Sequence, residues 1–181
     1  MSDDGAYAAL VREHSPTLAR LAYQLTHDVG ESEDLVQDVL LLTYRHWGQV
    51  SHADHPYAYL RRVMINRHLN SLRNRLRLAR SVTAADLPDT AAPIHDMVER
   101  DAMWQALDEL SPRQRAVLVL RYYERCDDGD IAAALGCRRS TVRSLAARGL
   151  TSLREVLTTL DAALDGAGPG AASRPHEKRP R

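Results

Sequence analysis

The residues best suited to chemistry in this sequence are four arginines set among small side chains near its C-terminal end. They are Arg138, Arg139, Arg143 and Arg148. No acidic residue occurs anywhere in 131–154. A guanidinium can donate two parallel hydrogen bonds to guanine and also binds phosphate, and small neighbours let a helix approach the bases closely. The chemistry that this pattern indicates is non-covalent recognition of DNA in the major groove.

The segment around these arginines has the spacing of a helix-turn-helix. Residues 130–150 read DIAAALGCRRSTVRSLAARGL, with apolar side chains at helical intervals in two short runs. Gly136 stands where the chain must turn sharply, and Ser140 is the expected N-cap of the second helix. The predicted inner face of that helix consists of Val142, Leu145, Ala146, Gly149 and Leu153. Its predicted outer face consists of Ser140, Arg143, Ser144, Ala147 and Thr151. An ordinary amphipathic hairpin is the alternative.

The composition favours helices throughout the chain. Its 181 residues are rich in alanine, leucine and arginine and contain no phenylalanine, and 24 basic residues balance 24 acidic ones. Few stretches show alternating β-branched residues, so the predicted fold class is all-α.

The charges are segregated along the chain. Residues 61–80, RRVMINRHLNSLRNRLRLAR, hold seven arginines and no acid, whereas residues 28–38, DVGESEDLVQD, hold five acids and no base. Such segregation indicates separate surfaces for separate partners.

Several function classes find no support in the residues. Cys126 and Cys137 have no metal-ligand spacing and are expected in the core of a reduced protein, and His52 and His55 are too few for a metal site. We therefore expect no catalytic residue, metal or cofactor, and no enzymatic activity. No apolar run is long enough to span a membrane, and the acidic N-terminus lacks the features of a secretion signal, so we expect a cytoplasmic protein.

The pattern of elements divides the chain into two small helical domains. Residues 1–80 form the first, with helices expected over 7–26, 32–47 and 56–80. Residues 81–97 are small, proline-containing and weakly acidic, which predicts a flexible linker. The second domain covers 98–160, and 161–181 is predicted to be a disordered tail. In the second domain Ser111, Pro112 and Gln114 form a capping box that starts a helix, whose residues Val117, Leu118, Leu120 and Tyr122 should point to the core.

Segments spread from Tyr7 to about Leu157 resemble bacterial sigma factors of the extracytoplasmic-function (ECF) type, an actinobacterial-type group of the sigma-70 superfamily. In the first domain these segments are LAYQLTHD, EDLVQDVLLLTYRHW and HPYAYLRRVMINRHLNSLR. In the second they are ALDELSPRQRAVLVLRYYE, DIAAALGC, STVRS and RGLTSLRE. Each is weak alone, but their order and distances are specific. The resemblance implies that 1–80 is sigma region 2 and 98–160 is sigma region 4.

The resemblance also implies three contact surfaces. Core RNA polymerase would be bound by Asp34, Leu35, Gln37, Asp38, Leu41 and Arg45. The promoter's −10 element would be recognised and opened by Tyr57, Arg61, Arg62, Asn66, Arg67, Asn70 and Arg73. The −35 element would be read by Arg138, Arg139, Ser140, Arg143, Ser144, Ala147 and Arg148. An inhibitory anti-sigma factor is a further partner usual in this family.

The function expected from these features is that of a transcription initiation factor. It would bind core RNA polymerase, direct it to −35 and −10 elements and assist DNA melting. One alternative is a stand-alone helix-turn-helix regulator, which has no need of the acid-rich second helix and the arginine-rich third. Another is a helical interaction protein that binds no nucleic acid, which the arginine stretches argue against.

Overall fold

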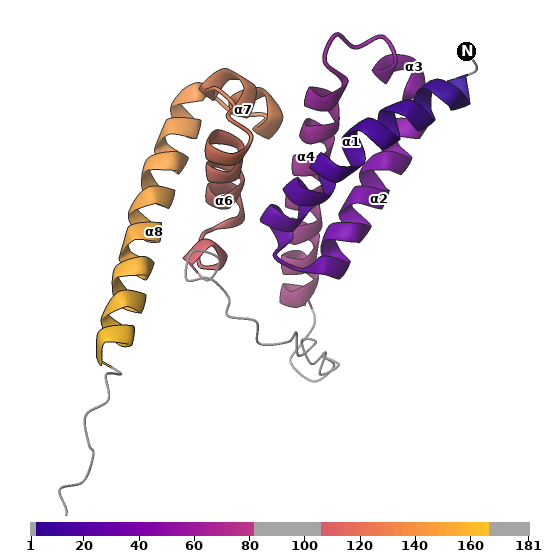
Figure 1. Cartoon of the computed structure of the whole chain (residues 1–181). Coiled ribbons are helices and arrows are strands. Elements are labelled where there is room, and N and C mark those ends of the chain that lie inside the picture. Colours follow the sequence, from indigo (N-terminus) through magenta and orange to yellow (C-terminus); the bar gives the residue numbers. More distant parts are fainter. Residues whose placement is uncertain (1–2, 82–105, 167–181) are drawn as a thin grey trace, which may run out of the picture.

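A computed structural model describes residues 3–81 and 106–166, and every element within these ranges is a helix. The first half of the molecule, 3–81, contains α1 (Asp3–Thr26), α2 (Val29–Arg45), α3 (Trp47–Val50) and α4 (Pro56–Ser81). The second half, 106–166, contains α6 (Pro112–Leu118), the π-helical turn η1 (Val119–Tyr123), α7 (Asp128–Leu135) and α8 (Arg139–Gly166). The halves lie side by side, with α1 and α4 on one side and α6 and α7 on the other (Figure 1). The predicted all-α fold is confirmed.

In the first half, α1, α2 and α4 pack around a small apolar core. Leu18, Leu21, Val39 and Leu60 are fully buried in it. The second helix begins at Val29, three residues before the expected start, because the Asp28 carboxylate caps it by accepting from the Glu31 amide at 2.7 Å. The second helix ends at Arg45, two residues before the predicted end, and the four-residue helix α3 follows it.

The capping box predicted at the start of α6 is confirmed. The Ser111 hydroxyl accepts from the Gln114 amide, and the Gln114 side chain accepts from the Ser111 amide at 3.0 Å. Val117, Leu118 and Leu120 are buried as predicted. The prediction that Tyr122 points to the core is wrong, since its side chain is 58% exposed. The π-helical turn η1 rotates the residues that follow α6 away from the α-helical register.

The helix-turn-helix is formed by α7 and α8. Gly136 ends α7 with φ 59° and ψ 44°, the left-handed conformation that its position predicts. The prediction for Ser140 is wrong, since α8 begins at Arg139 and places Ser140 inside its first turn. The predicted division of faces is confirmed: Val142, Leu145, Ala146 and Gly149 are buried, Leu153 is half-buried, and the predicted outer face is exposed.

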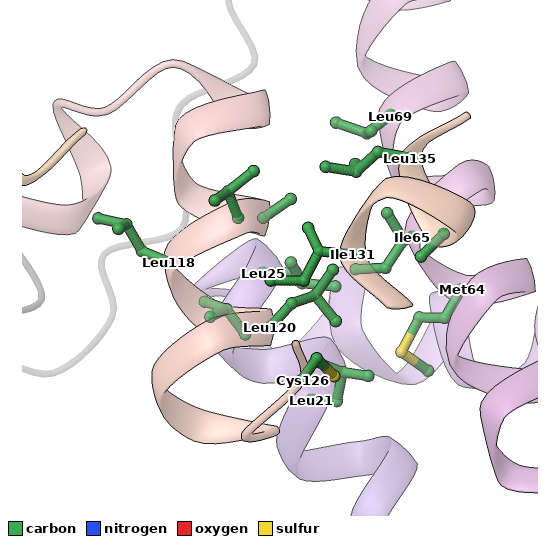
Figure 2. Packing of buried hydrophobic residues seen from close by; sticks show 14 of the residues in the cluster. Leu21, Leu25, Met64, Ile65, Leu69, Leu118, Leu120, Cys126, Ile131 and Leu135 are labelled. Atoms are coloured by element: carbon green, nitrogen blue, oxygen red, sulfur yellow. The ribbon is translucent and has the colours of Figure 1, made fainter. Parts of the chain in front are cut away.

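The two halves share one apolar core, whereas the sequence predicted two domains joined only by a flexible linker. Ile131 and Leu135 of α7 lie beside Ile65 and Leu69 of α4, and all four are less than one-tenth exposed (Figure 2). The physical reason is that this face of α7 is apolar and α4 offers it an apolar partner.

Polar contacts add to the apolar join between the halves. The Arg115 guanidinium donates to the carbonyl oxygens of Leu25 at 3.1 Å and Leu107 at 3.0 Å, and His27 Nδ1 lies 2.5 Å from an Asp108 carboxylate oxygen. These contacts attach the C-terminal end of α1 to the start of the second half.

Only some of the predicted domain boundaries lie in the part of the chain that the structure describes. The proposed linker, 81–97, lies outside them apart from Ser81, which ends α4. The last helix continues to Gly166, six residues into the segment predicted to be a tail, and 167–181 lie outside the described residues.

Candidate nucleic-acid interface

The outer face of α8 presents arginines around small side chains. All seven residues predicted to read the −35 element are exposed, with Arg138 directly before α8 and the others on it: Arg138, Arg139, Ser140, Arg143, Ser144, Ala147 and Arg148. The Arg143 side chain is 71% exposed although its Nε donates to Asp128 at 3.0 Å. The Ser144 hydroxyl is turned back and donates to the Ser140 carbonyl at 3.0 Å. The face is therefore cationic at its edges and shallow at its centre, as insertion into a major groove requires.

Two acids at the start of α7 lie beside the arginine-bearing end of α8: Asp127 caps α7, and Asp128 binds Arg143. The Asp127 carboxylate caps α7 by accepting from the amides of Gly129 at 2.6 Å and Asp130 at 2.8 Å, and these two bonds lower the pKa of Asp127. The hydrogen bond from Arg143 is the main cause of a lowered pKa at Asp128.

Gly129 has a specific role beside this cap. A Cβ atom at this position would collide with the end of the Arg139 guanidinium and lie 3.0 Å from the Asp127 carboxylate. The absent side chain leaves room for the Arg139 guanidinium beside the cap of α7.

On α4, four of the predicted DNA-binding residues form an exposed stripe. They are Arg62, Asn66, Asn70 and Arg73. Intervals of four, four and three residues place them on one side of the helix. The Arg73 guanidinium donates to the Asn70 side-chain oxygen at 2.9 Å. Guanidinium and amide groups along one helix side can bind phosphates and the edges of unpaired bases.

Two other arginines of α4 pair with acids of α2. Arg67 Nε donates to Asp38 at 2.7 Å, and Arg75 pairs with Glu31. Each of these side chains is between two-fifths and about half exposed. The pairs join the arginine-rich helix to the acidic one, so part of the segregated charge that the sequence shows is neutralised within the first half.

Tyr57 and Arg61, at the start of α4, are held by a residue of the second half. The Tyr57 hydroxyl donates to Glu124 Oε2 at 2.8 Å, and Arg61 Nη1 lies 3.7 Å from the same oxygen. Burial and the bond to Glu124 raise the pKa of Tyr57. Sequence reasoning missed Glu124, and within YYERC it has no signal that separates it from a solvated surface acid.

The predicted polymerase-binding residues lie on α2, but they are not equally accessible. Asp34, Gln37 and Arg45 are exposed, and Leu41 is 57% exposed. Leu35 is 6% exposed and belongs to the core of the first half, so its side chain is not available for an apolar contact. Asp38 is half-buried in its pair with Arg67.

Comparisons with known proteins decide the family. The models for sigma-70 region 2 and sigma-70 region 4 match residues 10–78 and 100–153. The RNA polymerase sigma-E factor of Streptomyces avermitilis is 37% identical over 155 residues, which cover 83% of this chain and 84% of that protein. The chain belongs to the sigma-70 family.

Further relatives place it in the ECF group of that family. The ECF RNA polymerase sigma factor SigL of Mycobacterium tuberculosis is 32% identical over 164 residues, which cover 86% of this chain and 93% of that protein. The fold is that of sigma factor RpoE from Bartonella quintana, solved in complex with the anti-sigma factor NepR, with a TM-score of 0.66 at 24% identity, covering 84% of this chain and 97% of that one.

This ECF sigma factor directs transcription initiation by RNA polymerase, which decides against the stand-alone regulator considered from the sequence. Within the described ranges, no helix is long and apolar enough to cross a membrane.

Proposed function

We propose that the two arginine-bearing helices of this sigma factor contact different elements of the same promoter. The outer face of α8 reads the −35 duplex, and the exposed stripe of α4, with Tyr57 and Arg61, binds the −10 element and assists its opening. The observation that carries this proposal is the presence of two cationic helix faces on two separate halves of the chain. One holds small residues between its arginines, as a reader of an intact groove needs, and the other holds amides, which suit unpaired bases.

The contact with core polymerase is assigned to the exposed side of α2. Asp34, Gln37 and Arg45 supply polar groups there, and Leu41 supplies the apolar one. The protein works by binding alone, without bond-making chemistry of its own, and acts in the cytoplasm beside the polymerase. An anti-sigma factor is proposed as a further partner, supported by the NepR complex of its structural neighbour.

Run-off transcription tests the promoter-directing function. Core polymerase from a Streptomyces species is mixed with this protein and a genomic DNA library, and transcript starts are mapped. We expect starts that share two upstream elements and that are absent with core enzyme alone. A set of starts that does not depend on the added protein would contradict the proposal.

The α2 assignment is tested by Leu41→Arg. Placing a charge at an exposed apolar contact should lower the affinity for core polymerase by about tenfold or more, since a central apolar contact typically contributes 1–2 kcal/mol. Leu76→Arg is the matched control, because Leu76 is equally exposed, at 57%, but lies on α4. Binding is measured by biolayer interferometry with immobilised core enzyme. Equal losses in both variants would contradict the assignment.

A further inference from the structure

Asp128, the first residue of α7, is bound by two arginines from different elements. The Oδ2 atom of its carboxylate accepts from Arg143 Nε of α8 at 3.0 Å, and its Oδ1 atom accepts from Arg121 Nη2 of η1. The Asp128 side chain is 24% exposed, and that of Arg121 is 26% exposed. Because each carboxylate oxygen has its own cationic partner, the carboxylate is held in one orientation between η1 and α8.

Arg143 is held at one end of its guanidinium and open at the other. Its Nε atom is bound to Asp128, while neither Nη atom has a hydrogen-bond partner among the residues that the structure describes. A guanidinium carries its five N–H groups in one rigid plane, so a bond at Nε also restrains the direction of the two Nη atoms. Those two atoms are sufficient for the paired hydrogen bonds that arginine makes to O6 and N7 of guanine.

The other arginines of the −35 set are placed differently. Within the described ranges, Arg143 is the member of that set whose guanidinium is paired with an acid. Arg148 Nε donates to the Ser144 carbonyl of its own helix at 3.2 Å, and the end of Arg139 lies beside Gly129. An arginine that is already held loses less rotamer freedom on binding than a free one. This matters most for a contact to a base, which requires a fixed direction and carries the sequence information.

On the basis of the proposed function of α8, we infer that Asp128 is a positioning residue for −35 recognition, which holds Arg143 by Nε so that its two Nη atoms select a guanine in the major groove. Arg121 supports this role, because it keeps the carboxylate in place and offsets its negative charge near the phosphates. Asp128 acts through Arg143 and touches no base itself.

The inference is tested with holoenzyme assembled from the full chain and core polymerase of a Streptomyces species. The DNA is a duplex promoter fragment found by run-off mapping, together with every single-base substitution of its −35 element. Competition binding gives the discrimination at each position, which is the affinity for the original fragment divided by that for the substituted one. Arg143→Ala identifies the guanine that this arginine reads.

The decisive variant is Asp128→Asn, which removes the charge that holds Arg143 and keeps the shape of the side chain. Its matched control is Asp130→Asn, the same change at an exposed position in the first turn of α7. The double variant of Asp128→Asn with Arg143→Ala shows whether Asp128 acts through this arginine. Circular dichroism checks folding, and Asp128→Ser replaces Asp128→Asn if the asparagine variant is not folded.

We expect Asp128→Asn to lower discrimination at the Arg143 guanine by about three- to tenfold, because the freed side chain must be ordered when it binds. Discrimination at the other positions should be unchanged, and Asp130→Asn should leave the whole profile as it is in the parent protein. In the Arg143→Ala background, Asp128→Asn should add no further loss.

An Asp128→Asn profile equal to that of the parent, a uniform loss across the element, equal losses in both asparagine variants, or a further loss in the Arg143→Ala background would each overturn the inference alone. If Arg143→Ala itself leaves every −35 position unchanged, the assignment of α8 as the −35 reader fails together with the inference. The two failures therefore give different results.

Discussion

The helices α4 and α8 both carry arginines toward proposed DNA sites, but they differ in what holds those arginines in the folded chain. On α8 the acid that holds Arg143 is Asp128, at the start of the neighbouring α7, within the same half. On α4 the acid that holds Arg61 is Glu124, which belongs to the other half. The −35 face is therefore preformed by local contacts, whereas one end of the −10 face, Tyr57 and Arg61, depends on how the two halves are arranged.

This difference follows from the side of each helix that is buried. The inner face of α8 packs against α6, where Gly149 allows Leu118 to approach closely: a Cβ at this glycine would lie 3.2 Å from a Leu118 methyl carbon. The α4 helix is buried against α1 and α2 within its own half and also against α7 of the other. A helix shared by two halves cannot expose all of its polar residues until the halves part.

The largest effect expected from this comparison concerns pH and His68, which lies on the buried side of α4 with 5% of its surface exposed. Burial, and to a smaller extent Arg115, lower the pKa of His68 to about 4, from the 6.5 of an ordinary histidine. Between these values the unfolded chain binds the proton and the folded chain does not. The contribution to stability is complete above pH 6.5 and is lost as the pH falls toward 4, by on the order of 3 kcal/mol.

Urea unfolding at pH 7 and pH 4.5 measures this loss. His68→Gln should have a smaller fall in the free energy of unfolding between the two values than the parent protein. His46→Gln, at an exposed position, is the control and should retain the parent's pH dependence. If His68→Gln has the same pH dependence as the parent, burial of an uncharged His68 is not what weakens the protein in acid.

The next prediction tests whether the arginine-bearing faces of α8 and α4 act on different DNA elements. Arg143→Ala should reduce discrimination at one or two positions of the −35 element by about 1–3 kcal/mol, or 5- to 150-fold, and leave strand opening unchanged once the complex has formed. Arg62→Ala should slow strand opening and leave the −35 preference intact. Competition binding to −35 duplex variants and permanganate footprinting of opened DNA, both with core polymerase, measure the two properties. The same defect in both variants would erase the proposed division between the helices.

The smallest effect is expected from Gly129→Ala, which tests how α8 is positioned. Alanine favours the helix by about 0.5–1 kcal/mol relative to glycine, but its Cβ displaces the end of the Arg139 side chain. Because that end is flexible, the free energy of unfolding should change by less than about 1 kcal/mol, while the contribution of Arg139 to −35 binding falls. Thermal unfolding and duplex binding check the two parts. A large loss of stability would show that the space at Gly129 is required by the backbone cap and not by Arg139.

Much of the local structure could be predicted from the sequence because its causes are local. The capping box at Ser111, the left-handed turn at Gly136 and the two faces of α8 each depend on residues within a turn or two of one another. Two expectations were wrong: the Asp28 cap starts α2 at Val29, three residues before the expected position, and η1 rotates Tyr122 out of the core.

The sequence predicted which residues make up the candidate site, but not which of their side chains are accessible to a partner. Residues of all three predicted surfaces are found exposed, yet Leu35 is buried and Tyr57 and Arg61 are occupied. The exposure of a helical residue depends on what packs against its face, and sequence periodicity shows that a face is apolar without showing which partner covers it.

The sequence by itself determined the long helices, the capping box at Ser111, the helix-turn-helix and the two arginine-rich faces, because short-range spacing and side-chain chemistry are sufficient for these. Only the tertiary structure decided that Ile131 and Leu135 bury the apolar side of α4 and that Glu124 reaches Tyr57 across 67 residues of chain. The reason is physical: burial of apolar surface is non-directional, so the pattern on α7 requires a partner but does not specify which one, and a lone glutamate acquires its role only from the position to which that packing brings it.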